Sequence, residues 1–308
     1  DGRHTEISFT DNWTADSERR DFTINSIYLD RKGKIFDPQM GLKDLRNRVI
    51  KFIGDPSKRI EEDYLRIIRF IRFSIQYDYS KYEKSTIQAI KLNLNGIQKI
   101  SKERILQEII KILKLDNFKN IASNKELQNI FLIIFPEFKY LTRIERLEIL
   151  SKKKLYMNNV EFLLAILLVD KSNNYEYFMH RYKLSNSMKN RINLFAKNYI
   201  EFTSNKNFFK KNINKNIYSH GKNIIKEFLF FSFLENKKMK EEELDSILAD
   251  IGKAKIPKFP FDGNYLKKRG FSEGQNIGHI LKDLEQEWVR NNYYLTEKNI
   301  NIIIKKFK

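Results

Sequence analysis

Residues 59–73 read RIEEDYLRIIRFIRF, and the apolar side chains of this region recur at the spacing of an α-helix. Counted from Tyr64, they stand at offsets of 3, 4, 7 and 11, as Ile67, Ile68, Ile71 and Ile75. These offsets place all of the side chains on one face of a helix. The segment therefore predicts a single amphipathic helix with one apolar face.

The charged residues of the same segment repeat at a matching step. Asp63 and Arg66 are three positions apart, and Arg69 and Arg72 follow at the same interval. On a helix such side chains are neighbours, so the simplest interpretation is a solvated face with salt bridges. A second interpretation is chemical, because a carboxylate beside a guanidinium presents an acceptor next to fixed donors.

That arrangement can distinguish nucleobases. Cytosine and adenine show an amino donor next to a ring-nitrogen acceptor on the Watson–Crick edge, whereas uracil and guanine place a carbonyl where the amino group would be. Facing a carboxylate, that carbonyl would leave buried polar groups unpaired. Asp63 and Arg66 are therefore candidate readers of C and A, and Arg69 and Arg72 could hold a triphosphate further along the helix.

A second charged motif is Arg19-Arg20-Asp21. Two adjacent guanidiniums can each present a planar fork to a phosphate, and the carboxylate can accept from ribose hydroxyls. Alone, such a triplet is more typical of ordinary surface charge. Here it leads directly into Thr23–Leu29, and a strand at that place would give the cluster a rigid support at a sheet edge.

The chain changes character near residue 50. Before it, Glu6–Thr10 alternates between polar and apolar residues, and Thr23–Leu29 and Lys34–Phe36 flank a turn at Asp30–Gly33. These patterns predict strands and a hairpin at the edge of a sheet. After Gly54-Asp55-Pro56 the patterns are helical, so the predicted fold class is α+β, mainly α, with a small β part followed by helices.

Several later helices are expected from their apolar spacing and caps. Ser101 is a plausible N-cap for Glu103–Leu113. The glycines between Gly263 and Gly278 are interpreted as helix ends and close packing. Further helices are predicted over Ile144–Leu150, Glu161–Val169, Ser187–Ala196, Ile224–Leu234 and Glu241–Ile251.

The composition favours a polyanionic partner. The chain of 308 residues carries 58 Lys+Arg against 39 Asp+Glu, a formal net charge of +19. Clustered cations bind nucleic acids through counterion release, although part of the surplus can reflect a Lys-rich composition.

Ser204–Lys226 is expected to be a solvated basic loop and helix start. The sequence has no cysteine for a disulfide or thiolate site, and no apolar run near the roughly 20 residues of a membrane span.

Taken together, these motifs resemble a known family. The matching blocks are RRDFTIN at 19–25, Asp37-Pro38 with Gly41 and Asp44-Leu45, GDP at 54–56, RIEEDYLR at 59–66 and SKERILQE at 101–108. They look like class II tRNA nucleotidyltransferases and the related bacterial poly(A) polymerases. The resemblance is specific over residues 1–113 and looser beyond, and it resumes at residues 261–288 in a segment similar to the tail of CCA-adding enzymes.

The resemblance implies a domain order and site residues. It implies the C-terminal part of a nucleotidyltransferase head at 1–50, a helical neck for base recognition at 51–115, and a helical body and tail that bind tRNA at 116–308. Asp63 and Arg66 would read the base, and Asp21 would meet the ribose. The implied nucleotide-binding residues are Arg20, Asp21, Asn25, Asp63, Arg66, Arg69 and Arg72, and the implied bracing residues are Glu62, Arg104 and Glu108.

The implied activity is the addition of CCA to the 3′ end of tRNA from CTP and ATP without a template. The implied partner is tRNA, held at its acceptor arm and elbow, in a cytoplasmic protein that contacts no membrane. The family holds two Mg²⁺ ions on an Asp-x-Asp pair, and that pattern does not occur in this sequence. We therefore expect that the N-terminal segment with the metal ligands is missing and that the chain alone is inactive.

Two other interpretations stay open at this point. A bacterial poly(A) polymerase shares the same arginine and aspartate blocks and would add only A. A non-catalytic RNA-binding helical protein, or one subunit of a split enzyme, would need no metal ligands of its own.

Overall fold

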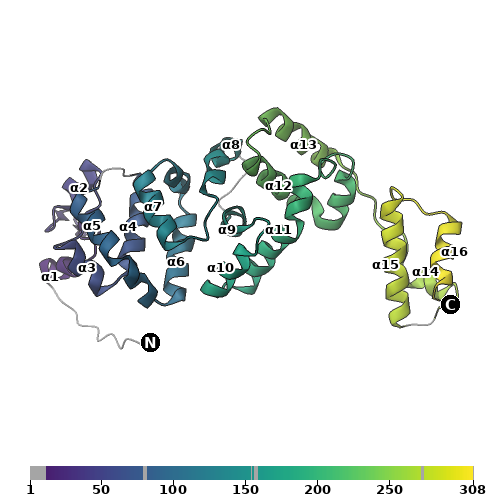
Figure 1. Ribbon diagram of the computed structural model, residues 1–308, viewed down its shortest axis with the longest axis horizontal. Helices are drawn as coiled ribbons and strands as arrows, with labels where there is room; N and C mark the ends of the chain where they lie inside the picture. Colours follow the sequence, from purple (N-terminus) through teal and green to yellow (C-terminus); the bar gives the residue numbers. More distant parts are fainter. Residues whose placement is uncertain (1–11, 79–81, 154, 156–158, 272–273, 308) are drawn as a thin grey trace. The chain divides into compact units, whose positions relative to one another are not determined.

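The computed structural model describes residues 12–78, 82–153, 155, 159–271 and 274–307. It is mainly α-helical with one small sheet, which confirms the predicted fold class (Figure 1). The chain divides into two compact units, Asp1–Tyr199 and Ile200–Lys308. The predicted strand at Glu6–Thr10 lies outside the described residues.

The small sheet is the predicted hairpin. Strands β1 (Tyr28–Leu29) and β2 (Ile35–Phe36) pair antiparallel, with Tyr28 opposite Phe36. Gly33 in the connecting turn has a φ of 81°, a backbone conformation that glycine adopts at no steric cost. Helices α1 (Trp13–Glu18) and α2 (Gly41–Asn47) lie before and after the hairpin along the chain.

The predicted strand over Thr23–Leu29 is wrong in its first half, because Thr23–Asn25 forms a 3-10 helix instead. The carbonyl of Thr23 accepts hydrogen bonds from both the backbone nitrogen and the hydroxyl of Ser26. Such local hydrogen bonds offer the backbone an alternative to a sheet ladder. Just before this 3-10 helix, Phe22 forms an isolated antiparallel bridge to Phe52.

The single helix predicted through residues 63–75 is interrupted at its start. Helix α3 (Pro56–Glu62) is capped by Asp55, and α4 (Leu65–Gln76) follows after a break. The break lies at Asp63, whose backbone is extended with φ −156° and ψ 101°. Its Oδ1 accepts from the backbone nitrogen of Leu65 at 3.2 Å, which satisfies one of the donors at the start of α4.

The apolar stripe of α4 is buried as predicted. Ile67, Ile68 and Ile71 have no exposed surface, and Ile75 is 2% exposed. The helix packs beside α6 (Lys102–Leu113), for which Ser101 is the N-cap, as expected. Helix α5 (Lys84–Asn93) packs against α3 and completes this group.

The rest of the first unit is helical. The helix predicted over Glu161–Val169 is confirmed, and the one predicted over Ser187–Ala196 is confirmed but extends to Ser204. In the region predicted as Ile144–Leu150, residues 141–146 form a 3-10 helix before α8. The bounds are α7 Lys125–Ile134, α8 Leu147–Lys152, α9 Val160–Leu168, α10 Asn174–Tyr182 and α11 Asn186–Ser204, of which the last crosses the boundary between the units.

In the second unit, α12 (Ile213–Glu235) contains a kink at Gly221, where φ is 79°. Three lysines before this helix are exposed, Lys206, Lys210 and Lys211, so the predicted basic loop is present. Phe208 and Phe209 within the same loop are buried, which the prediction of a solvated segment did not include.

The other helices of this unit are α13 (Glu241–Lys253), α14 (Gly263–Lys267), α15 (Gln275–Arg290) and α16 (Glu297–Lys305). Gly270 and Gly274 lie between α14 and α15 with positive φ, which agrees with their interpretation as helix-end glycines. In the described part of the chain, no helix has the length and apolarity that a membrane crossing needs.

A close approach between Gly96 and Tyr64 gives a test of this packing. A Cβ at Gly96 would overlap the Tyr64 ring, next to the break between α3 and α4. We expect Gly96→Ala to lower the free energy of unfolding by about 1–3 kcal/mol, because the ring must move out of a packed position. Urea unfolding followed by circular dichroism would measure the loss.

The matched control is Gly252→Ala in α13, where an added Cβ meets nothing within 4 Å. That change should be neutral or stabilising by up to about 1 kcal/mol, as expected for alanine in a helix. Equal effects of the two substitutions would contradict the close contact at Gly96.

Candidate nucleotide site

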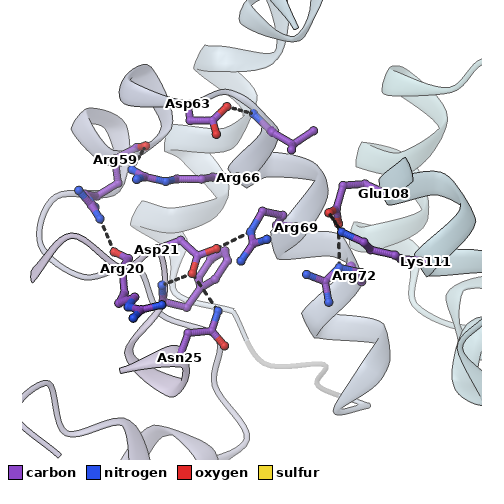
Figure 2. A network of polar contacts seen from close by, with 12 residues as sticks. Arg20, Asp21, Asn25, Arg59, Asp63, Arg66, Arg69, Arg72, Glu108 and Lys111 are labelled. Carbon is purple, nitrogen blue, oxygen red and sulfur yellow. Dashed lines mark hydrogen bonds and ion pairs between the residues drawn. The ribbon is translucent and has the colours of Figure 1, made fainter. Parts of the chain in front are cut away.

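A cavity of about 470 Å³ brings together most of the residues that the sequence singled out. Figure 2 shows Asp63 and Arg66 on one side of this site and Asp21, Asn25 and Arg69 on the other. Three of the predicted residues do not line the cavity, namely Glu62, Arg72 and Glu108. Glu62 accepts from Arg66, which lines it, and Arg72 and Glu108 pair with each other. The residues that line it are Arg19, Arg20, Asp21, Asn25, Asp63, Leu65, Arg66, Arg69, Phe73 and Arg104.

Asp21 joins the N-terminal part of the site to α4. Its carboxylate is 8% exposed and accepts from the Nε of Arg69 at 2.5 Å and from the Nδ2 of Asn25 at 2.8 Å. Backbone hydrogen bonds fix the segment around Asp21. The carbonyl of Asp21 accepts from the backbone nitrogen of Ile53, and the backbone nitrogen of Thr23 donates to the carbonyl of Lys51. Arg69 therefore lines the cavity while its guanidinium is held by Asp21.

The predicted side-by-side pair of Asp63 and Arg66 is not formed among the described contacts. Asp63 ends α3 in an extended conformation, so it is not on one helix with Arg66. Its Oδ2 instead accepts from Arg104 of α6 at 2.6 Å. Arg66 donates to Glu62 and to the backbone carbonyl of Arg59, both at 2.6 Å. Both side chains line the same cavity, each held by a different partner.

Glu62 shares its carboxylate between two arginines. Its Oε2 accepts from Arg66 and from Arg59, each at 2.6 Å. The hydrogen bond from Arg66 is the main reason that the pKa of Glu62 lies below its usual range, and the bond from Arg59 adds to it against the opposing effect of burial. Glu62 is thus ionised at neutral pH and orients Arg66, as its predicted bracing role requires.

Arg72 lies one turn beyond Arg69 and pairs with Glu108 of α6. The Arg72 Nε donates to Glu108 at 2.7 Å, Lys111 donates to the same carboxylate at 2.8 Å, and the guanidinium lies 4.1 Å from the centre of the Phe73 ring. Burial alone would raise the pKa of Glu108, but the bonds from Lys111 and Arg72 outweigh it and lower the pKa below its usual range. Arg104 and Glu108 thus connect α6 to both parts of the site.

Arg20 is held by residues that the sequence analysis did not single out. Asp16 accepts from Arg20 at 2.8 Å, from Arg19, and from the hydroxyl of Tyr28 at 2.8 Å. These bonds, that from Arg20 foremost, keep the pKa of Asp16 well below its usual range. The spacing of four residues between Asp16 and Arg20 could have indicated the pair, had α1 been predicted. Phe73 and Arg59 were missed as well.

The described residues do not fit a magnesium site. Within the ranges that the structure describes, no three side chains of His, Asp or Glu gather where they could hold a metal ion. The carboxylates of Asp21, Asp63 and Glu62 are each occupied by a guanidinium. Arginines paired in this way can orient and bind an anionic ligand, but they provide no place for two divalent cations.

The lowered pKa of Glu108 predicts a pH-dependent contribution to stability. A carboxyl whose pKa is lower in the folded state stabilises the fold above its unfolded pKa, about 4.3 for Glu, and loses this contribution as the pH falls through the folded value. We expect Glu108→Gln to be less stable than the wild type at pH 7 by about 1–3 kcal/mol, because Arg72 loses its charged partner. The difference should shrink as the pH falls below 4.3.

Urea unfolding between pH 3.5 and pH 7 would measure this dependence. Glu61→Gln is the matched control, because Glu61 is an exposed acid on α3 in the same unit. A stability difference for Glu108→Gln that stays constant over this range would contradict the ion pair.

Comparisons with known proteins agree with this geometry. Residues 1–51 match a family described as the Poly A polymerase head domain, and residues 81–141 match one described as the probable RNA and SrmB-binding site of polymerase A. The mitochondrial CCA tRNA nucleotidyltransferase 1 of Danio rerio is 29% identical, over 97% of this chain and 69% of its own length. The CCA-adding enzyme of Lactobacillus helveticus is 28% identical, over 92% of this chain and 70% of its own length.

Solved structures show the same fold. The CCA-adding enzyme of Bacillus stearothermophilus in complex with CTP superposes with a TM-score of 0.72 at 18% identity, over 97% of this chain and 75% of that one. The CCA-adding enzyme of Thermotoga maritima complexed with tRNA superposes with a TM-score of 0.62 at 21% identity, over 96% and 74%. With the motifs at 19–25, 59–66 and 101–108, these comparisons show that the chain is similar in sequence and in fold to class II tRNA nucleotidyltransferases and bacterial poly(A) polymerases.

Proposed function

We propose that this chain selects CTP and ATP and holds tRNA during the template-independent addition of CCA to the tRNA 3′ end. The main support is the cavity of about 470 Å³ itself, which is lined by Asp63, Arg66, Arg69 and Asp21. The relatives named as CCA-adding enzymes, and the related structures complexed with CTP and with tRNA, support the same activity.

Base selection would rest on Asp63 and Arg66. Both oxygens of Asp63 already accept one hydrogen bond, from Leu65 and from Arg104. A carboxylate oxygen can accept a second bond, so Asp63 keeps the capacity to meet the amino group of C or A. A carboxylate has no proton to donate, so it offers no partner to the carbonyl of U or G.

Phosphate and ribose binding would fall to the residues on the other side. Arg20 and Arg69, which line the cavity, and Arg72, which does not, are the arginines proposed to hold the phosphates, with Asp21 and Asn25 at the ribose. Each of these three guanidiniums is oriented by a carboxylate, from Asp16, Asp21 and Glu108 respectively. A guanidinium presents donors in several directions, so such pairing leaves further donors for a phosphate.

Nucleotidyl transfer in this family would use Mg²⁺ to stabilise the attacking hydroxyl and the leaving pyrophosphate, and the described carboxylates do not fit that role. The proposed contribution of this chain is therefore recognition, by the neck at 51–115 for the nucleotide and by the body and tail at 116–308 for tRNA. A cytoplasmic location also stays a prediction, since the relatives include mitochondrial proteins.

Base selection can be tested by binding. We expect the chain to bind CTP and ATP more tightly than UTP and GTP, and Asp63→Ala to reduce that preference by roughly 5- to 150-fold, or about 1–3 kcal/mol. Equilibrium titration of each nucleotide would measure it. Asp55→Ala is the matched control, since it removes an aspartate at the other end of α3 that caps the helix without lining the cavity.

The outcomes separate the alternatives. A preference for ATP alone would favour a poly(A) polymerase. No binding of any nucleotide would favour a non-catalytic RNA-binding protein. Unchanged selectivity in Asp63→Ala would reduce Asp63 to a structural partner of Arg104.

Binding to tRNA is tested by its salt dependence. Each phosphate contact adds about 0.7–0.9 to the slope of log K against log salt. Lys210 and Lys211 are exposed in the basic loop before α12, and we expect replacement of both by Gln to lower that slope by about 1.4–1.8. Lys43→Gln, at an exposed lysine on α2 and outside residues 116–308, is the control. A slope that neither change alters would remove the basic loop from the tRNA surface.

A further inference from the structure

Arg59 connects the two sides of the nucleotide site. Its NH1 donates to Glu62 at 2.6 Å, and its NH2 donates to the backbone carbonyl of Arg20. The carbonyl of Arg59 itself accepts from Arg66 at 2.6 Å. Figure 2 shows Arg59 between Arg66 and the segment with Arg20. Arg59 itself does not line the cavity.

These contacts are not those of an ordinary surface pair. An exposed Arg–Glu pair three residues apart on a helix contributes little to stability. The Arg59 side chain is only 12% exposed, and its second partner lies 39 residues earlier in the chain. That partner, the carbonyl of Arg20, belongs to the residue directly before Asp21, which in turn holds Arg69 and Asn25.

We propose that Arg59 is a positioning residue that couples base selection to phosphate binding, an inference that rests on the proposed function. The base side consists of Asp63 and Arg66, and Arg66 is oriented by Glu62 and by the Arg59 carbonyl. The phosphate side includes Arg20 and Arg69. By holding the Arg20 backbone against Glu62, Arg59 fixes the separation between the two sides.

The coupling affects ligands that contact both sides of the site differently from ligands that contact only one side. A nucleoside triphosphate whose base fits binds the base side and the phosphate side at the same time. Once one side is bound, binding of the other is favoured only when the distance between the two sides is fixed. A ligand that meets one side alone does not need that spacing. Only a planar guanidinium presents NH1 and NH2 to two acceptors in a fixed geometry, and a lysine ammonium lacks this fork.

The experiment compares Arg59→Gln and Arg59→Lys with the wild type by titration of CTP, UTP and inorganic tripolyphosphate. We expect both variants to bind CTP about tenfold more weakly, the size expected for losing a hydrogen bond to a charged group. UTP and tripolyphosphate should change by less than about twofold. The preference for CTP over UTP therefore falls by about tenfold although neither base-reading residue is altered.

The matched control is Arg290→Gln. Arg290 also pairs with a glutamate three residues away, Glu287, at 3.1 Å, but on α15 in the other unit. This change should leave the affinity for all three ligands unaltered. Thermal unfolding of each variant shows whether it is folded, and Arg59→Lys, which keeps the charge, decides the question if Arg59→Gln does not fold.

The outcomes distinguish the inference from the function on which it rests. Equal weakening of CTP, UTP and tripolyphosphate would mean a general loss of the site and would overturn the coupling. Full wild-type selectivity in both Arg59 variants would overturn it as well, while the proposed function would stand. A wild-type chain without preference for CTP over UTP would overturn both.

Discussion

The ion pair between Asp21 and Arg69 is the interaction on which the site depends. It joins residues 48 positions apart, one in the segment before the hairpin and the other on α4. The Asp21 side chain is 8% exposed, so its charge must be compensated within the protein. Removing one partner of such a buried pair typically costs about 3–5 kcal/mol, because the other charge is left unpaired. The pair joins the segment of Asp21 to α4, and both residues line the cavity.

The same arrangement is repeated around the cavity. Arg20, Arg66, Arg72 and Arg104 are paired with Asp16, Glu62, Glu108 and Asp63 respectively. A long side chain held in one rotamer has already lost much of the conformational entropy that ligand binding would otherwise cost. The carboxylates also reduce the repulsion between neighbouring guanidiniums. The pairs thus orient guanidinium donors for a polyanion, although each carboxylate also lowers the net positive charge around the cavity.

Local signals in the sequence predicted most of the fold. Ser101 caps α6 as expected, and the spacing of Ile67, Ile68 and Ile71 predicted the buried face of α4, because both depend on contacts within one helix. Pairs between elements were not predictable in this way. The partner of Asp63 is Arg104, 41 residues away, and periodicity within a segment carries no information about such contacts. The resemblance to a family named Arg104 as a bracing residue, but only the structure gives its partner.

The break at Asp63 shows why the spacing alone was misleading. In a continuous helix Asp63 and Arg66 would be neighbours at i, i+3 and would pair with each other. The extended backbone at Asp63 turns its carboxylate towards α6, and Arg66 is left to pair with Glu62. Each member of the proposed base-reading pair is therefore held by a third residue rather than by the other. A spacing that resembles a helical salt bridge instead marks a junction between two helices, and that junction keeps an acceptor and a donor in one cavity without joining them.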